Sequence, residues 1–107
     1  MPLYNKLVRD KIPKIIESTG KECSTKILNN DEYIKALQEK SFEELKVYVD
    51  SKTNDEAIEE LADILEIIHS FAEYHVVSME KVEEVRKRKL ETRGGFNDRI
   101  FLLEVED

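Results

Sequence analysis

Residues 55–75 read DEAIEELADILEIIHSFAEYH, and this stretch decides the fold of the chain. Its apolar residues recur at intervals of three and four, which is the spacing of one face of an α-helix. The preceding residues Thr53-Asn54-Asp55-Glu56 form a capping-box sequence, which predicts where this helix begins. We expect its buried face to consist of Ala57, Leu61, Ile64, Leu65, Ile68, Phe71 and Ala72.

Two acidic side chains adjoin that apolar face. Glu60 and Asp63 are three residues apart, so they lie about 60° apart around the helix and can point at one spot. Two carboxylates beside a core repel each other unless a cation lies between them, and carboxylate oxygens suit Mg²⁺. The sequence therefore predicts a magnesium site at Glu60 and Asp63.

The neighbouring segments predict three further helices, and the short turn at residues 50–52 makes the second and third helices antiparallel neighbours. Two β-branched or apolar runs, at residues 21–28 and 100–105, favour short strands that can pair with each other. We expect the further helices at residues 10–18 with Asp10 as N-cap, at residues 31–49 capped by Asn30, and at residues 78–91, begun by Ser78 and ended by Gly94-Gly95.

The expected fold class is therefore all-α: an antiparallel helical hairpin or bundle of about four helices, with short terminal β segments. At 107 residues the chain fits a single domain, residues 1–107. Antiparallel packing brings the middle of the second helix beside the start of the third, so Glu44 is expected to face Glu60 and Asp63 and to complete the metal site. Glu43 or Glu59 is the candidate for orienting an attacking water.

Basic residues gather near both ends of the chain, at Arg9 and Lys11 and again at Lys89 and Arg93. Arg93 directly precedes two glycines, which allow a backbone to approach a ligand closely, and arginine can hold phosphate with two parallel hydrogen bonds. These four residues are candidates for binding substrate phosphates. The alternative is that the basic residues in the last turn of a helix complement the helix dipole.

The net charge of −7 is unevenly distributed. An acidic middle between basic flanks argues against a nucleic-acid surface, which needs one continuous basic face. No apolar run approaches the roughly 20 residues that span a bilayer, so no membrane partner is expected. The charged N-terminal residues lack the apolar block of a signal peptide, and one cysteine forms no internal disulfide; both favour a cytoplasmic protein.

Three blocks carry a family resemblance: YNKLVRDKIP at residues 4–13, EELADILEII at residues 59–68 and RGGF at residues 93–96. Together they resemble the MazG-related all-α nucleotide pyrophosphohydrolases, in particular the small branch similar to phosphoribosyl-ATP pyrophosphohydrolase. The resemblance implies a Mg²⁺-dependent enzyme that cleaves a nucleoside triphosphate between the α and β phosphates, often in nucleotide-pool cleaning. It also implies a homo-oligomer, either a dimer or a tetramer.

The family's metal site combines Glu-x-x-Glu on one helix with Glu-x-x-Asp on the next, and only the second half is present here, as Glu60 and Asp63. Aligning Glu44 with the first glutamate places Val47 on the second. Glu43 or Asp50 can fill that position, although Lys46 on the same face would repel a cation. The alternative is a nucleotide-binding or helical interaction module that keeps the fold with weakened or no catalysis.

Overall fold

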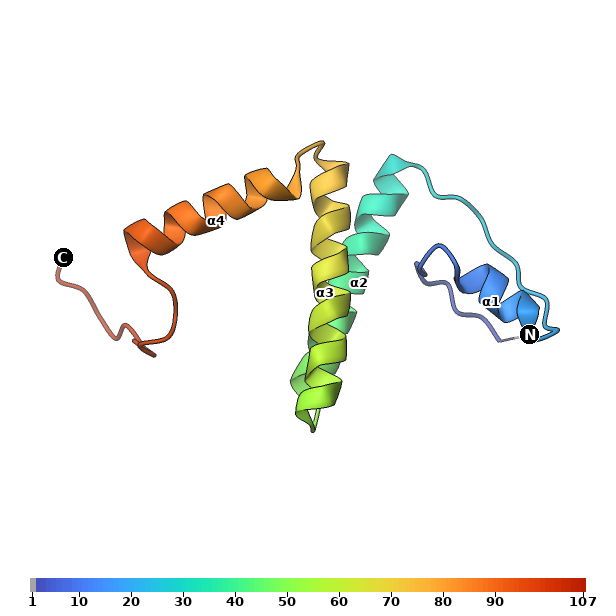
Figure 1. The fold of residues 1–107 in the computed structure, drawn as a ribbon, viewed down its shortest axis with the longest axis horizontal. Coiled ribbons are helices and arrows are strands. Elements are labelled where there is room, and N and C mark those ends of the chain that lie inside the picture. The colour runs from blue at the N-terminus through green and yellow to red at the C-terminus, as the bar shows by residue number, and fades with distance from the viewer. Residues whose placement is uncertain (1) are drawn as a thin grey trace.

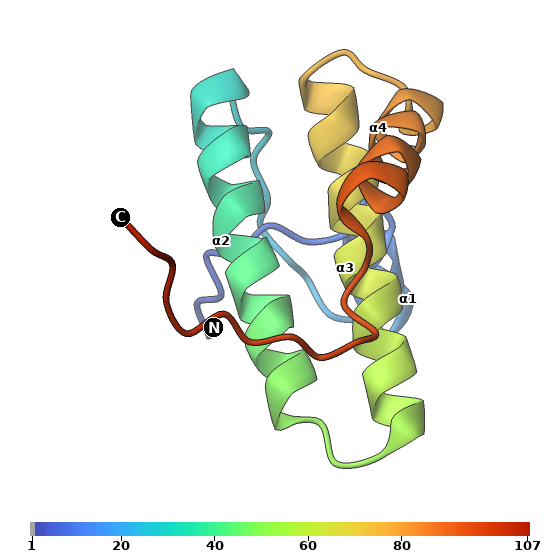
Figure 2. The ribbon, with the colours of Figure 1, turned by 90° about the vertical axis from the view of Figure 1, so that its left-hand side faces the viewer.

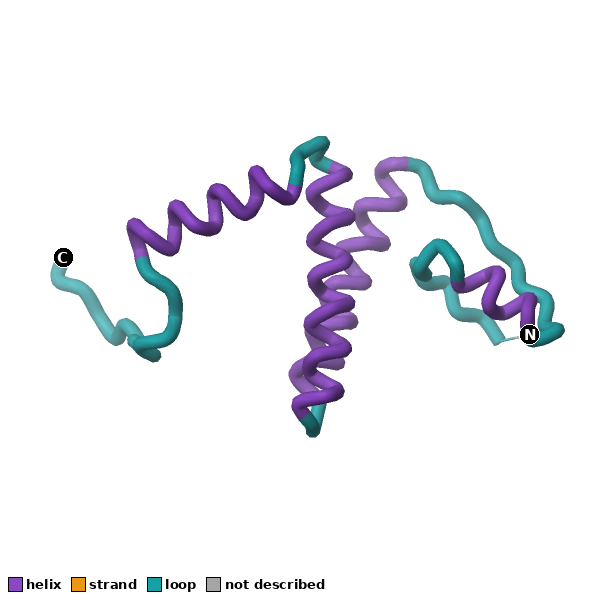
Figure 3. The backbone as a smooth tube through the Cα atoms, viewed as in Figure 1, coloured by secondary structure: helices purple, strands orange, loops and turns teal. Residues whose placement is uncertain are grey.

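The computed structural model of the protein describes residues 2–107, which form four α-helices and no strand. Figures 1 and 3 show a central pair of long helices with one helix diverging on each side. The all-α fold class is therefore confirmed. The helices are α1 (Ile12–Ser18), α2 (Asn30–Asp50), α3 (Asn54–Tyr74) and α4 (Met79–Arg93).

The helices α2 and α3 form an antiparallel hairpin joined by a short turn, as Figure 2 shows. The α3 N-terminus follows the expected chemistry, because the Thr53 hydroxyl oxygen accepts a hydrogen bond from the Glu56 backbone N–H at 3.2 Å. The Glu56 carboxylate departs from the capping-box pattern and accepts instead from the Lys52 N–H at 2.8 Å. At the α2 end of the turn, the Ser51 backbone N–H donates to the Tyr48 carbonyl oxygen at 3.1 Å, so hydrogen bonds hold both ends of the turn.

Two of the expected caps are displaced by one residue. The N-cap of α2 is Asn29 rather than Asn30, and Asn29 forms a reciprocal capping box with Glu32. The N-cap of α1 is Lys11 rather than Asp10, and its side chain makes no cap hydrogen bond. By contrast, Ser78 caps α4 as expected, by accepting from the Lys81 N–H at 3.1 Å.

The core is small and lies between α2 and α3. Leu37 is 3% exposed and Ile67 is 7% exposed, and both lie fifteen residues from Lys52 at the centre of the turn. Antiparallel helices joined by this turn therefore place Leu37 opposite Ile67. The third buried apolar residue is Ala72, near the contact between α3 and α4.

The prediction of the buried face of α3 is partly wrong for the single chain. Leu61 and Leu65 are 50% and 52% exposed, and Ile68 is 39% exposed. The apolar arc of α3 is wider than one neighbouring helix can cover, and α2 covers the side that carries Ile64 and Ile67. Helical spacing identifies such an arc but does not say which part of it faces the neighbour.

The two expected strands are absent, which is a further correction. Residues 21–28 and 100–105 have no regular structure, and Figure 1 places them on opposite sides of the central hairpin. A strand forms only when another backbone segment supplies its hydrogen bonds, and neither run reaches one. The apolar side chains of the C-terminal run are instead strongly exposed, as Phe101 (86%) and Leu103 (86%) illustrate.

The chain as a whole is extended. Its radius of gyration is 18.4 Å, whereas a compact chain of this length has a radius of gyration of about 13 Å. Its accessible surface is 10293 Å², against about 6,200 Å² for a compact monomer of the same mass. Within the described residues, no helix combines the length and apolar character needed to cross a membrane.

Candidate metal centre

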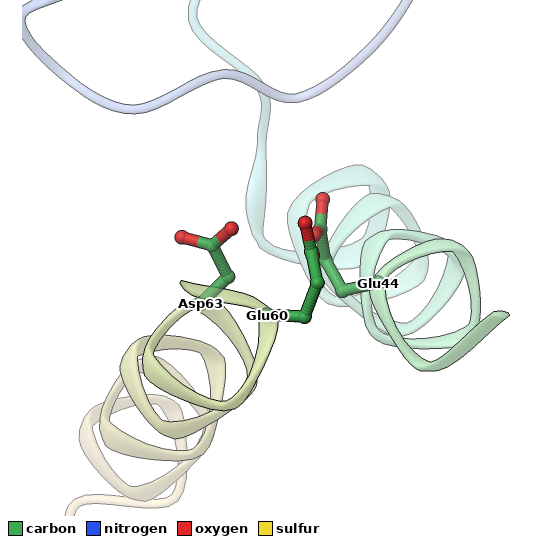
Figure 4. Close-up of side chains that lie close together, drawn as sticks. All are labelled: Glu44, Glu60 and Asp63. Carbon is green, nitrogen blue, oxygen red and sulfur yellow. The ribbon is translucent and has the colours of Figure 1, made fainter. Parts of the chain in front are cut away.

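Three carboxylates from two helices converge on one side of the hairpin. Glu44 lies on α2, and Glu60 and Asp63 lie one turn apart on α3. One oxygen atom of each lies within 4.8 Å of the others. Figure 4 shows all three side chains directed toward the side on which the N-terminal segment runs. The structure thus brings together the three residues that the sequence analysis expects as metal ligands.

The hairpin register explains this convergence. Glu44 lies eight residues before Lys52 and Glu60 lies eight residues after it. The turn that places Leu37 opposite Ile67 therefore also places Glu44 opposite Glu60. The Glu44 side chain is only 13% exposed, and that of Asp63 is 37% exposed. The three acids therefore lie at the edge of the core, where charge is less screened than on an open surface.

Glu60 is the most perturbed group of the three. Its Oε2 atom is buried and has no hydrogen-bond partner among the protein groups. A hydrogen bond with the Glu44 carboxyl, which forms only when one of the two groups holds a proton, is the main cause that raises the pKa of Glu60 to about 7, and burial and the negative charges of Glu44, Asp63 and Glu59 add to it. Two ionised carboxylates have no proton to share, so either a proton or a cation must satisfy this pair.

Three basic side chains surround the acids. Arg9 donates to Asp63 Oδ1 at 2.6 Å, and Lys6 donates to Glu43 Oε1 at 3.1 Å. Lys40 Nζ lies 3.4 Å from Glu44 Oε1 and 3.9 Å from Glu43 Oε2. The hydrogen bond from Lys6 is the main cause that lowers the pKa of Glu43, and the charge of Lys40 adds to it.

Sequence reasoning missed Lys40 as a neighbour of the metal centre. Lys40 is four residues before Glu44 on α2, a spacing that places two side chains on the same helix face. That spacing was the available signal. The contacts of Lys6 and Arg9 had no such signal, because their acidic partners are 37 and 54 residues away in the sequence.

The other expected site residues lie outside the cluster. Glu59 is exposed on α3 next to Glu60, and Lys11 is exposed at the start of α1. Lys89 and Arg93 lie exposed on α4, which extends away from α3 on the opposite side of the hairpin from α1. A single chain therefore does not bring Lys89 and Arg93 to the carboxylates.

The first-helix positions that differ from the family pattern are also exposed. Lys46, Val47 and Asp50 all have exposed side chains on α2, and none of them belongs to the cluster of three acids. Neither Lys46 nor Asp50 makes an ion pair with another described residue. Glu44 is thus the carboxylate that α2 contributes.

A shallow, open hollow lies near the open end of the hairpin, well away from the three acids along the helices. Its aromatic wall consists of Tyr33 and Tyr74, whose ring centroids are 6.5 Å apart with the rings tilted by 52°. The hollow is lined by Asn30, Tyr33, Ser70, Glu73 and Tyr74. It does not include any of the converging carboxylates.

Comparison with known proteins yields no relative. No protein-family model matches the chain, and no curated protein or solved structure shows significant similarity to it.

Proposed function

We propose that the protein is a Mg²⁺-dependent nucleotide pyrophosphohydrolase that converts a nucleoside triphosphate to the monophosphate and pyrophosphate. The observation that carries the proposal is the convergence of Glu44, Glu60 and Asp63 on one side of the hairpin. The resemblance of three sequence blocks to the MazG-related family supplies the reaction type. A phosphorylated substrate also agrees with the cytoplasmic location that the sequence analysis expects.

The acids fit a hard divalent cation. Their oxygens lie within 4.8 Å of one another, and oxygens bound to one Mg²⁺ at about 2.1 Å lie no more than about 4.2 Å apart. Rotation of a carboxylate or a bridging water closes that difference. The buried, unpartnered Oε2 of Glu60 gains a partner when a cation binds. A bound Mg²⁺ would neutralise charge on the substrate phosphates and lower the pKa of a coordinated water.

In the proposed reaction, water adds to the α phosphorus, the bond to the α–β bridging oxygen breaks, and pyrophosphate leaves. Glu59 is better suited than Glu43 to accept the proton of the attacking water. Glu59 is exposed and lies one turn before Asp63, whereas Glu43 is held by Lys6 and Lys40 with a lowered pKa. Arg9 and Lys11 would bind the phosphates from the N-terminal side.

We also propose that the chain assembles with copies of itself. Its surface of 10293 Å² exceeds that of a compact monomer by about 4,000 Å². This excess is larger than the roughly 1,000–2,500 Å² that each chain of an obligate homodimer buries. The uncovered apolar stripe of α3 offers such an interface. Its members are Ile58, Leu61, Leu65 and Ile68. Since a single chain keeps Lys89 and Arg93 away from its own acids, these residues would serve the site only across such an interface.

The activity test measures pyrophosphate release from a panel of normal and modified nucleoside triphosphates with Mg²⁺. We expect Asp63→Ala to abolish release. Glu66→Ala is the matched control, because Glu66 is an exposed carboxylate one turn further along the same helix and lies outside the cluster. Equal rates for Asp63→Ala and the wild-type protein would remove Asp63 from the mechanism.

The alternative is a nucleotide-binding module without turnover. Two observations favour it: α2 contributes one carboxylate to the cluster, and Arg9 donates a hydrogen bond to Asp63. Calorimetry separates the two functions, because the module binds a triphosphate with no pyrophosphate release whatever metal is added.

The assembly test is light scattering coupled to size-exclusion chromatography. We expect the wild-type protein to elute as an oligomer and Leu65→Glu to elute as a monomer, because the charge would be buried in an apolar interface. Glu66→Lys changes charge next to the stripe as a control. A monomeric wild-type protein at micromolar concentration would contradict the proposed assembly.

A further inference from the structure

The N-terminal segment crosses the hairpin at the acidic cluster and is tied to both helices. Lys6 pairs with Glu43 on α2, and Arg9, three residues later, pairs with Asp63 on α3. The two ion pairs therefore flank Glu44 and Glu60, and the segment places two positive charges beside the carboxylates. Figure 4 shows this segment passing over the side to which the three acids point.

Asp63 has two competing uses. Its Oδ1 atom accepts a hydrogen bond from Arg9, and the same carboxylate belongs to the proposed metal ligands. A guanidinium that occupies this carboxylate both blocks it and repels an approaching cation. A free divalent ion that takes Oδ1 displaces Arg9 and leaves it without an acidic partner, and one that takes the other oxygen binds beside the positive charge of Arg9.

A cation that is already bound to phosphate can bind without leaving Arg9 unpaired. Asp63 can turn to the metal while Arg9 exchanges the carboxylate for a phosphate, which guanidinium binds with two parallel charge-assisted hydrogen bonds. Both Arg9 and Asp63 remain half exposed, with side chains 58% and 37% exposed, so this exchange needs no opening of the core. An exposed pair of this kind is weak enough to exchange readily.

We propose that Arg9 makes the site selective for a divalent cation bound to phosphate over the free ion, and that Lys6 anchors the segment that carries Arg9. The proposal rests on the metal site of the proposed function. Arg9 then has two opposite effects: it weakens binding of the bare cation, and it strengthens binding of the cation–phosphate complex. A residue with a purely structural contribution would not produce that pair of effects.

The experiment measures Mn²⁺ binding by electron paramagnetic resonance, with Mn²⁺ alone and with imidodiphosphate, which resists hydrolysis. For Mn²⁺ alone, we expect Arg9→Ala to bind roughly two- to fivefold more tightly than the wild-type protein, the range of an exposed ion pair. With imidodiphosphate, we expect Arg9→Ala to bind about tenfold more weakly or worse, because a charged hydrogen bond to phosphate is lost.

Two further variants test the assignment to Arg9. Lys6→Ala loosens the anchor, so both effects are expected with the same signs and smaller sizes. Arg99→Ala removes one positive charge from the C-terminal segment, where Arg99 makes no ion pair with a described acid, and should leave both affinities unchanged.

The outcomes separate this inference from the proposed function. Failure of the wild-type protein to bind Mn²⁺ under either condition would overturn the metal site and the inference with it. If the wild-type protein binds Mn²⁺ and Arg9→Ala binds Mn²⁺ alone with equal or lower affinity, the selectivity assigned to Arg9 is overturned. The metal site is then still supported.

Discussion

Metal binding is expected to depend on pH through Glu60. The pKa of this side chain is raised from 4.5 to about 7, chiefly by the hydrogen bond with Glu44, and a metal ligand must lose its proton. At pH 6 a group with this pKa is about nine-tenths protonated, and at pH 8 about one-tenth. Proton competition therefore makes the apparent affinity for Mg²⁺ about tenfold weaker at pH 6 than at pH 8.

The same group sets the pH dependence of stability without metal. Because its folded-state pKa lies above 4.5, the folded chain binds more protons than the unfolded chain between pH 4.5 and about pH 7. The free energy of unfolding is therefore expected to fall as the pH rises through this window and to level off above it. Glu60→Gln should flatten this dependence, because it cannot ionise.

Isothermal titration calorimetry with Mg²⁺ tests this reasoning. Titrations at each pH in two buffers of different ionisation enthalpy give the number of protons released. We expect about 0.9 protons per bound cation at pH 6 and about 0.1 at pH 8. Glu66→Gln, a change to an exposed carboxylate on the same helix, should keep both values. An affinity equal at pH 6 and pH 8 with no proton release would refute the assignment to Glu60.

Three stability predictions follow from particular contacts. Thr53→Ala removes the cap of α3 and should lower the free energy of unfolding by about 1 kcal/mol, measured by urea denaturation. Ile67→Ala leaves a cavity opposite Leu37 and should cost about 2–5 kcal/mol in the same assay. Gly94 ends α4 with φ +81° and ψ 176°, a region open essentially to glycine, so Gly94→Ala should cost about 1–3 kcal/mol at this turn and speed tryptic cleavage after Arg93. Tryptic cleavage at the wild-type rate would show that the turn tolerates a side chain.

The helices and most of their caps could be predicted from the sequence because their determinants are local. Residues within a few positions of one another determine the apolar spacing of α3, the Thr53 cap and the Ser78 cap. The one-residue error at Asn29 has the same origin, since Asn29 and Asn30 are adjacent residues of the same type. The strands could not be predicted reliably, because strand formation requires a partner that local sequence does not reveal.

The candidate metal centre also has a part that local sequence predicts and a part that depends on the fold. The pair Glu60 and Asp63 could be predicted from the sequence, because helical geometry places residues three apart on neighbouring parts of the helix surface, and the short turn indicated Glu44. The packing of the helices was needed to show that α2 covers one part of the apolar arc of α3 and leaves Leu65 exposed. The contact between Arg9 and Asp63, which are 54 residues apart in the sequence, also became visible only in the folded chain, because a contact over that separation depends on the path of the intervening chain.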